Sequence, residues 1–275
     1  PGAESAAGLS ASTVERLTCG TVAPIVKRLI VTADDFGLTG GVCTGILQGL
    51  SEGIVTSTSA LVCDPAACRR LANWRDALAG QVGVHLQLTD GRPVCDPARI
   101  ASLVTAEGAF PRLPGGIGAI DADDLRREWH AQVSASLQCG VEPTHVDTHH
   151  HVHSNATAFE VYCEIARCYD LAARSLSAEM TRELRARGLR CADHSAGWDG
   201  ASQQSLLETI SRLFACGENV AEVVCHPAHH DSDLEEASLY AGPRARELDV
   251  LCATGLRRTL YDRGIALASA TILPV

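Results

Sequence analysis

The sequence predicts a single α/β domain, a closed or nearly closed (β/α) barrel of the TIM type. Short apolar strands alternate with longer helical segments from about residue 28 to the end of the chain. Repeated βα units of this kind form parallel sheets. Eight strand candidates in a chain of 275 residues match the size of one barrel. An open, doubly wound sheet is the alternative architecture.

The predicted elements follow one another in a regular order. The strand candidates are short runs rich in Val, Leu, Ile and Ala, at 28–34, 55–62, 82–88, 144–149, 171–175, 189–193, 222–226 and 266–272. The helical segments between most of them have apolar residues at the spacing of a helix, at 40–52, 65–78, 124–138, 156–168, 177–187, 202–215 and 243–262.

Two segments lie outside this alternation. Residues 1–23 are rich in Ala, Ser and Gly, and we expect a flexible extension there, with the barrel domain spanning 24–275. Residues 89–121 carry several Gly and Pro and fit neither a helical nor a strand period. A connection this long in a compact domain is usually functional, so we expect it to form a substrate loop beside the strand of His85.

Composition limits the classes of function. Apolar residues make up 46% and charged residues 20%, which is typical of a globular protein, and no apolar run reaches the length of a membrane span. The net charge of −10 argues against nucleic acid and anionic membranes as partners. The twelve cysteines include no CxxC pair, and the chain shows no secretory signal. We therefore expect reduced, structural cysteines and a cytoplasmic location.

The decapeptide THVDTHHHVH at 144–153 contains five of the eleven histidines. Its alternate positions 145, 147, 149, 151 and 153 hold His or Asp, so any part that forms a strand directs these groups to one face. Histidine is a common ligand of transition metals. The spacing allows either His149 or His151 as a ligand, and His150 is expected to point away from that face.

Further polar residues fall where predicted strands end. Those residues are Asp34, Asp35, His85, Asp147, His149, Arg174, Asp193 and His226. In a barrel the carboxyl ends of the strands meet at one mouth, so these side chains are expected to gather there. One carboxylate and two imidazoles around a divalent ion leave positions open for water and substrate, as catalytic sites require. Asp34 and Asp35 should point apart, so one can ligate while the other acts as a base.

Five segments together resemble the YdjC-like carbohydrate deacetylases, which include chitooligosaccharide and hopanoid-linked aminosugar deacetylases. These segments are ADDFG at 33–37, GVHLQLT at 83–89, THVDTHHHVH at 144–153, CHP at 225–227 and the run Arg246-Glu247-Leu248 before Leu251. The resemblance covers about residues 28–272. It implies a distorted (β/α) barrel and the metal-dependent removal of an N-acetyl group from an amino sugar or glycoconjugate.

The resemblance also implies roles for individual residues. Asp35, His85 and His149 would bind the metal, with His149 assigned by matching DTH to the family's DSH. Asp34 would be the general base and His226 the general acid. The family usually has HPG where this chain has His226-Pro227-Ala228. His151, His153 and Arg174 would line the substrate site. In the mechanism that we expect, Asp147 and Asp193 orient imidazoles.

Two other functions remain as alternatives. A metal-dependent phosphoesterase could use the same ligands, but the proposed mouth offers few cations beyond Arg92 and Arg174. A non-catalytic sugar-binding protein would need aromatic platforms, and aromatic residues are only 4% of the chain. The ligand set favours one divalent ion, Zn first, with Mg, Mn, Co or Ni allowed. The sequence leaves open the sugar itself and a homodimer.

Overall fold

The computed structural model describes residues 27–198, 200–215 and 217–273, and the extension predicted at 1–23 lies outside them. The strands form one sheet in which every pairing is parallel. They are β1 (Lys27–Phe36), β2 (Ser57–Ala60), β3 (Val82–Leu86), β4 (His145–Thr148), β5 (Ala172–Ala173), β6 (His194–Gly197), β7 (Val220–Cys225) and β8 (Ile265–Leu267). The α/β barrel class is thereby confirmed.

The barrel is distorted in two places. The strand order is β5-β4-β3-β2-β1-β7-β6, so β1 pairs with β7 where a regular barrel would place β8 between them. Among the described residues, strand β8 pairs only with Lys27–Leu29 at the start of β1. No ladder joins β5 to β6 in the described part of the chain; a single bond from the Ala173 amide to the Arg190 carbonyl, 2.7 Å, spans that side. The sheet is therefore a half-barrel.

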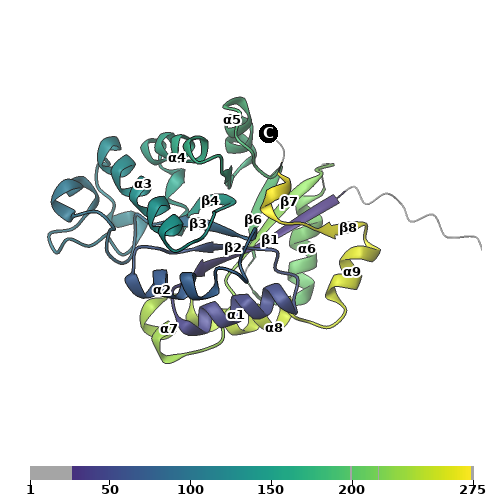
Figure 1. Cartoon of the computed structure of the whole chain (residues 1–275). Helices are drawn as coiled ribbons and strands as arrows, with labels where there is room; N and C mark the ends of the chain where they lie inside the picture. Colours follow the sequence, from purple (N-terminus) through teal and green to yellow (C-terminus); the bar gives the residue numbers. More distant parts are fainter. Residues whose placement is uncertain (1–26, 199, 216, 274–275) are drawn as a thin grey trace, which may run out of the picture.

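Helices flank this sheet (Figure 1). They are α1 (Gly40–Ser51), α2 (Pro65–Trp74), α3 (Ala122–Gln138), α4 (Ala156–Cys168), α5 (Ala178–Ala186), α6 (Gln203–Leu213), α7 (Ser232–Ala237), α8 (Ala241–Leu251) and α9 (Leu256–Asp262). Several begin at a side chain that accepts an amide hydrogen bond from the first turn, such as Thr39, Asp64 and Asn155. In the described ranges, no helix combines the length and apolarity that a membrane span needs.

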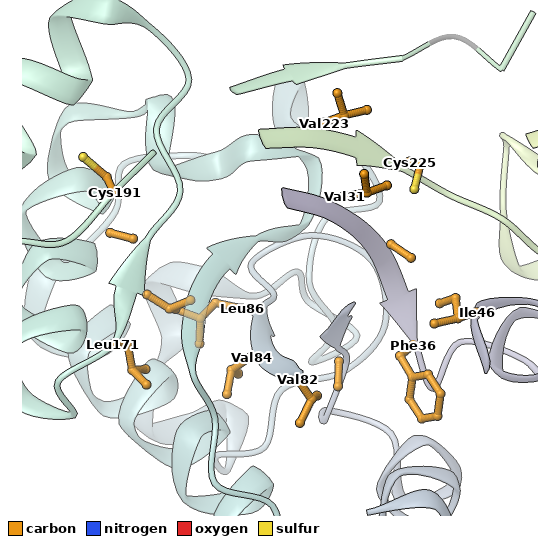
Figure 2. Close-up of a cluster of buried hydrophobic side chains, with 14 of the residues drawn as sticks. Val31, Phe36, Ile46, Val82, Val84, Leu86, Leu171, Cys191, Val223 and Cys225 are labelled. Carbon is orange, nitrogen blue, oxygen red and sulfur yellow. The ribbon is translucent and has the colours of Figure 1, made fainter. Parts of the chain in front are cut away.

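The core lies between the sheet and these helices. Strand residues such as Val31, Val84 and Val223 are fully buried and lie in the same cluster as Phe36 and Ile46 (Figure 2). Burial on both faces explains why the strands are nearly continuous apolar runs, as parallel strands usually are. The polar residues that interrupt these runs near the strand ends are therefore exceptions that require partners.

Two predicted elements need correction, and one helix was missed. The strand predicted at 189–193 is wrong, because strand β6 begins only at His194. The helix predicted at 243–262 is two helices, since the chain turns at Gly255 with φ of 85°. Helix α7 was not predicted. The segment 89–121 contains only the short 3-10 turns η1 (Pro97–Arg99), η2 (Ala101–Leu103) and η3 (Pro114–Gly116), as expected for a loop.

Candidate metal centre and active site

The two adjacent aspartates lie in an irregular part of β1. The pairing of β1 with β2 shifts register between Ala33 and Phe36, and Asp35 has a positive φ of 72°. Such a bulge turns the chain locally. Both carboxylates consequently line the same cavity, although side chains of successive residues in a regular strand point apart. Within that cavity the two carboxylates have different partners, Arg174 for Asp34 and Arg244 for Asp35.

Three ligand atoms form a nearly equilateral triangle at the carboxyl ends of the strands. Asp35 Oδ1 is 3.1 Å from His149 Nδ1 and 3.4 Å from His85 Nε2, and the two nitrogens are 3.3 Å apart. Asp35 lies in β1 and His85 in β3, and His149 directly follows β4. The structure thus brings together the three residues that the resemblance implied as metal ligands.

The donor atoms of this triangle and the distances between them fit a divalent ion. Asp35 Oδ1 is buried and has no hydrogen-bond partner, which is costly unless something else satisfies it. Metal–ligand bonds of about 2.0–2.1 Å in tetrahedral geometry place ligand atoms about 3.3 Å apart. The observed edges of 3.1–3.4 Å match that spacing. Asp34, His85 and Asp147 form a second, overlapping group of ligand atoms.

His85 is held from behind by Asp147. Its Nδ1 lies 2.6 Å from Asp147 Oδ1, which leaves Nε2 facing Asp35. Ser59 donates a hydrogen bond to the other oxygen of Asp147. Burial lowers the pKa of His85, but Asp147 and Asp34 outweigh it and raise that pKa to about 9. Asp147 therefore has the orienting position predicted for it.

Arg174 is a buried cation beneath the cavity. Its guanidinium donates two hydrogen bonds to Asp34, of 2.7 and 2.8 Å, and lies 2.6 Å from Asp147 Oδ2. Its Nε also donates to Glu222 at 3.2 Å. The side chain is 2% exposed and does not line the cavity, so the structure places Arg174 behind the site, where it fixes the plane of the Asp34 carboxylate.

A second buried guanidinium holds the Asp35 carboxylate. Arg244 Nη2 donates to Asp35 Oδ2 at 2.6 Å and lies 3.3 Å from the Ser238 hydroxyl. Burial alone would raise the pKa of Asp35, but Arg244 and His149 hold it well below its usual value. Asp35 therefore stays ionised, with Oδ2 held by Arg244 and Oδ1 without a hydrogen bond.

The histidine run is a strand only at its start. Strand β4 ends at Thr148, and His150 and His151 both have φ of 54°. These two left-handed residues turn the chain so that His149, His150 and His151 all line the cavity. The centroid of the His150 ring lies 3.9 Å from that of His149, with the two rings tilted by 35°, and His150 Nδ1 lies 2.9 Å from the Thr89 hydroxyl. The prediction that His150 points away is wrong.

His153 lies below the cavity surface. Its ring is fully buried and stacks on Tyr162 at 4.5 Å, and its Nδ1 lies 2.5 Å from the Thr148 hydroxyl. Burial and the neighbouring His151 lower the pKa of His153 to about 3. The structure does not bring His153 to the substrate side, whereas His151 lines the cavity as expected.

His226 directly follows β7, whose Cys225 pairs with Ala33 of β1, and it lines the cavity together with Asp34 and Asp35. Its amide donates to Glu247, and its ring packs edge-on against Tyr240, 5.5 Å between centroids. Burial lowers the pKa of the imidazole to about 4, against the two aspartates, which raise it. Its side chain is thus neutral near pH 7 in this pocket.

Asp193 lies at the opposite end of the barrel. It precedes β6, and its carboxylate accepts the amides of Asn219 and Val220, both at 2.8 Å, and pairs with Arg185. The predicted strand 189–193 placed this residue at a carboxyl end, whereas the true strand starts after it. The expectation that Asp193 orients an imidazole at the site is therefore wrong.

The site opens into a cavity of about 380 Å³. Besides the residues above, segment 89–121, which we call the insertion, contributes Asp90, Arg112, Leu113 and Pro114. The segment before α8 contributes Ala237, Ser238, Leu239 and Tyr240. The expectation that segment 89–121 takes part in the site therefore agrees with the lining of the cavity.

Sequence reasoning missed Arg244 and Glu247 as parts of the site. Both are buried in α8, three residues apart, so they share one face of the helix. Charged residues on the buried face of a predicted helix were the available signal. The run at 246–248 contains Glu247, but the sequence alone indicates no role for this residue.

Comparisons with known proteins agree on one family. A sequence model described as YdjC-like protein matches residues 28–262. A carbohydrate deacetylase of Geobacillus stearothermophilus is 36% identical over 88% of this chain and 96% of its own. A chitooligosaccharide deacetylase of Klebsiella pneumoniae is 35% identical over 88% and 98%.

A solved structure agrees with the fold as well. A protein of Enterococcus faecalis V583, described as a cellobiose-phosphate cleavage protein, superimposes with a TM-score of 0.82 at 32% identity. The match covers 89% of this chain and 97% of that one.

Proposed function

Because the chain belongs to the YdjC-like family, we propose that it is a metal-dependent hydrolase that removes an N-acetyl group from an amino sugar or glycoconjugate. The relatives described as carbohydrate and chitooligosaccharide deacetylases support the reaction. One observation carries the assignment: the free Oδ1 of Asp35 faces two imidazole nitrogens at ligand spacing, beside a second carboxylate in a cavity.

Asp35, His85 and His149 hold one divalent ion in this proposal, with Zn the first choice. When bound, such an ion polarises an amide carbonyl and lowers the pKa of a water. Asp34 accepts the proton of the attacking water, and the two hydrogen bonds from Arg174 keep its carboxylate in one orientation. His226 is neutral near pH 7, so in this proposal it first takes up the proton that the attacking water released to Asp34 and then passes it to the leaving nitrogen. The C–N bond thereby breaks to acetate and a free amine.

The residues of the cavity also argue against the two alternative functions, a phosphoesterase and a non-catalytic sugar-binding protein. Of the two arginines that line the cavity in the described chain, Arg244 already binds Asp35, which leaves Arg112 to meet a phosphate. A sugar-binding protein without catalysis gives no reason for a buried carboxylate oxygen that lacks a partner.

The test is acetate release from N-acetylglucosamine and its oligomers by the chelated protein, reloaded with Zn, Mg, Mn, Co or Ni. We expect acetate only with metal, and no phosphate from p-nitrophenyl phosphate. Activity that survives chelation, or phosphate release in place of acetate, would refute the proposal.

Two matched variants separate the aspartates. Asp34→Asn should retain the ion in calorimetry but lose about 10²–10⁴-fold in kcat. Asp35→Asn should lose the ion as well. Full turnover by Asp34→Asn would show that Asp34 is not the general base.

A further inference from the structure

Glu222 is a buried carboxylate to which the mechanism above gives no role. It is the only charged residue of β7, whose other members are apolar and buried. A buried carboxylate is costly unless hydrogen bonds satisfy it. Glu222 does not belong to the lining of the catalytic cavity, so its contacts inside the barrel have to account for it.

Both oxygens of this carboxylate are held by the strands on either side. In the sheet, β7 lies between β1 and β6 (Figure 1). The Thr32 hydroxyl of β1 donates to Oε1 at 2.8 Å, and the Ser195 hydroxyl of β6 donates to Oε2 at 2.8 Å. Glu222 therefore has one orientation, which three adjacent strands set.

The Oε1 atom of Glu222 also contacts Arg174. It lies 3.2 Å from Nε and 3.2 Å from Nη2, so it occupies one edge of the guanidinium. Asp34 accepts from Nη1 and Nη2 on the neighbouring edge, at 2.7 and 2.8 Å. A guanidinium is planar and rigid, so partners on two edges fix both its plane and its rotation within that plane.

The two aspartates by themselves leave Arg174 one motion. Asp34 and Asp147 share its Nη2 atom, which lies 2.8 Å from an oxygen of the first and 2.6 Å from an oxygen of the second. Without a partner at Nε, the guanidinium can pivot about this shared nitrogen, and Nη1 then moves away from Asp34. The contact with Glu222 opposes that pivot.

We infer that Glu222 is a positioning residue for the general base. It holds Arg174, and Arg174 holds the Asp34 carboxylate in the orientation that faces the cavity. Glu222 itself touches no substrate. The inference rests on the role proposed above for Asp34, and it adds a residue of another strand on which that role depends.

Two substitutions separate the position of the carboxylate from its charge. Glu222→Gln loses the charge but keeps the reach of the side chain and an oxygen that accepts from Thr32 and Arg174. Glu222→Asp keeps the charge but withdraws it from Arg174 by one methylene. We expect Glu222→Asp to lower kcat for N-acetylglucosamine oligomers about tenfold or more, with KM and Zn affinity within about twofold, because small displacements at a site are costly to the rate. Glu222→Gln should retain most of the parental kcat.

Glu160→Asp is the matched control. It shortens a glutamate that also pairs with an arginine, Arg187, but at the surface and away from the cavity. Both kcat and KM should stay at the parental values. A double-mutant cycle tests the path through Arg174: in the Arg174→Lys background, Glu222→Asp should lower kcat no further.

The NMR signal of the Arg174 Nε–H group is a readout that needs neither metal nor substrate. In the metal-free parent we expect a downfield signal that exchanges slowly with water, assigned by its absence in Arg174→Lys. Glu222→Asp should shift it upfield and broaden the Nη–H signals that face Asp34, whereas Glu222→Gln should leave the Nη–H signals sharp. If these changes occur and no substrate releases acetate with any metal, the proposed function fails, while Glu222 remains the residue that orients Arg174.

Other results would overturn the inference. Parental kcat and sharp Nη–H signals in Glu222→Asp would do so. Equal losses of kcat in Glu222→Asp and Glu222→Gln would assign Glu222 to charge balance, and an additive loss in the Arg174→Lys background would show that it acts by another route. If urea unfolding shows that Glu222→Asp does not fold, Ser195→Ala replaces it, because it removes the bond to Oε2 alone. That variant should also lower kcat with KM unchanged, and a parental kcat would refute the inference.

Discussion

The floor and the mouth of the cavity are built in opposite ways. The floor consists of buried charges at strand ends, and nearly every one is held by another, as Arg174 holds Asp34 and Asp147. The mouth is formed by connecting segments, where the exposed Leu113 and Leu239 lie among polar residues such as Asp90 and Arg112. A buried charge is tolerated only with partners, so the floor is rigid and specific in chemistry. The mouth can vary without disturbing it, which suits a surface that selects among substrates.

The largest effect should come from the ligand triangle. His149→Ala is expected to lower metal affinity by at least about 100-fold, whereas His151→Ala should change it little, because His151 is not a member of the triangle. Calorimetric titration of the chelated protein with Zn measures both. The reverse order of the two variants would show that the turn at His150 and His151 is rebuilt when the ion binds.

The next effect concerns the buried cation of the floor. Arg174→Met leaves Asp34, Asp147 and Glu222 without their common partner, and we expect a loss of about 3–5 kcal/mol in the free energy of unfolding. Urea unfolding measures it. Arg187→Met is the control, since Arg187 pairs with Glu160 at the surface and should cost about 1 kcal/mol or less. Similar losses in both variants would contradict the contrast between buried and exposed pairs.

Glu247 links floor and mouth, and its pKa predicts a pH effect. Burial raises this pKa to about 7, although the His226 amide and the Tyr240 hydroxyl lower it. Between the unfolded value near 4.5 and 7 the folded state retains a proton that the unfolded state loses, so stability falls as pH rises through this window. Replacement by glutamine should remove this pH dependence of the free energy of unfolding, which amounts to roughly 3 kcal/mol at most.

Urea unfolding of both proteins between pH 4 and pH 8 measures the difference. We expect Glu247→Gln to gain stability relative to the parent as pH rises. Parallel pH profiles would show that Glu247 is ionised throughout this range.

The smallest effect should come from the anchor of the mouth. Glu128→Gln weakens the bonds to the Val94 and Cys95 amides, with an expected loss of about 1–3 kcal/mol. The floor should remain intact, so KM for the substrate should rise while metal affinity stays constant. A parallel loss of metal affinity would mean that the insertion supports the floor as well.

Much of the floor could be predicted from sequence. Asp34, Asp35, His85 and Asp147 fall at the ends of apolar runs, and the ends of parallel strands converge at one edge of a barrel. That rule needs only the periodicity and the order of elements. It failed for Asp193, because a strand boundary wrong by a few residues moves a side chain to the other end of the barrel.

The sequence by itself determined the α/β barrel, its family and the residue types of the metal site, because local periodicity and motif spacing report these directly. The tertiary structure decided the bulge at Asp35, the left-handed turn at His150 and His151, and the positions of Arg174 and Arg244. These features depend on contacts between residues up to about two hundred positions apart, such as Asp35 and Arg244. Contacts between such distant residues form only when the whole chain folds, and no local sequence pattern encodes them.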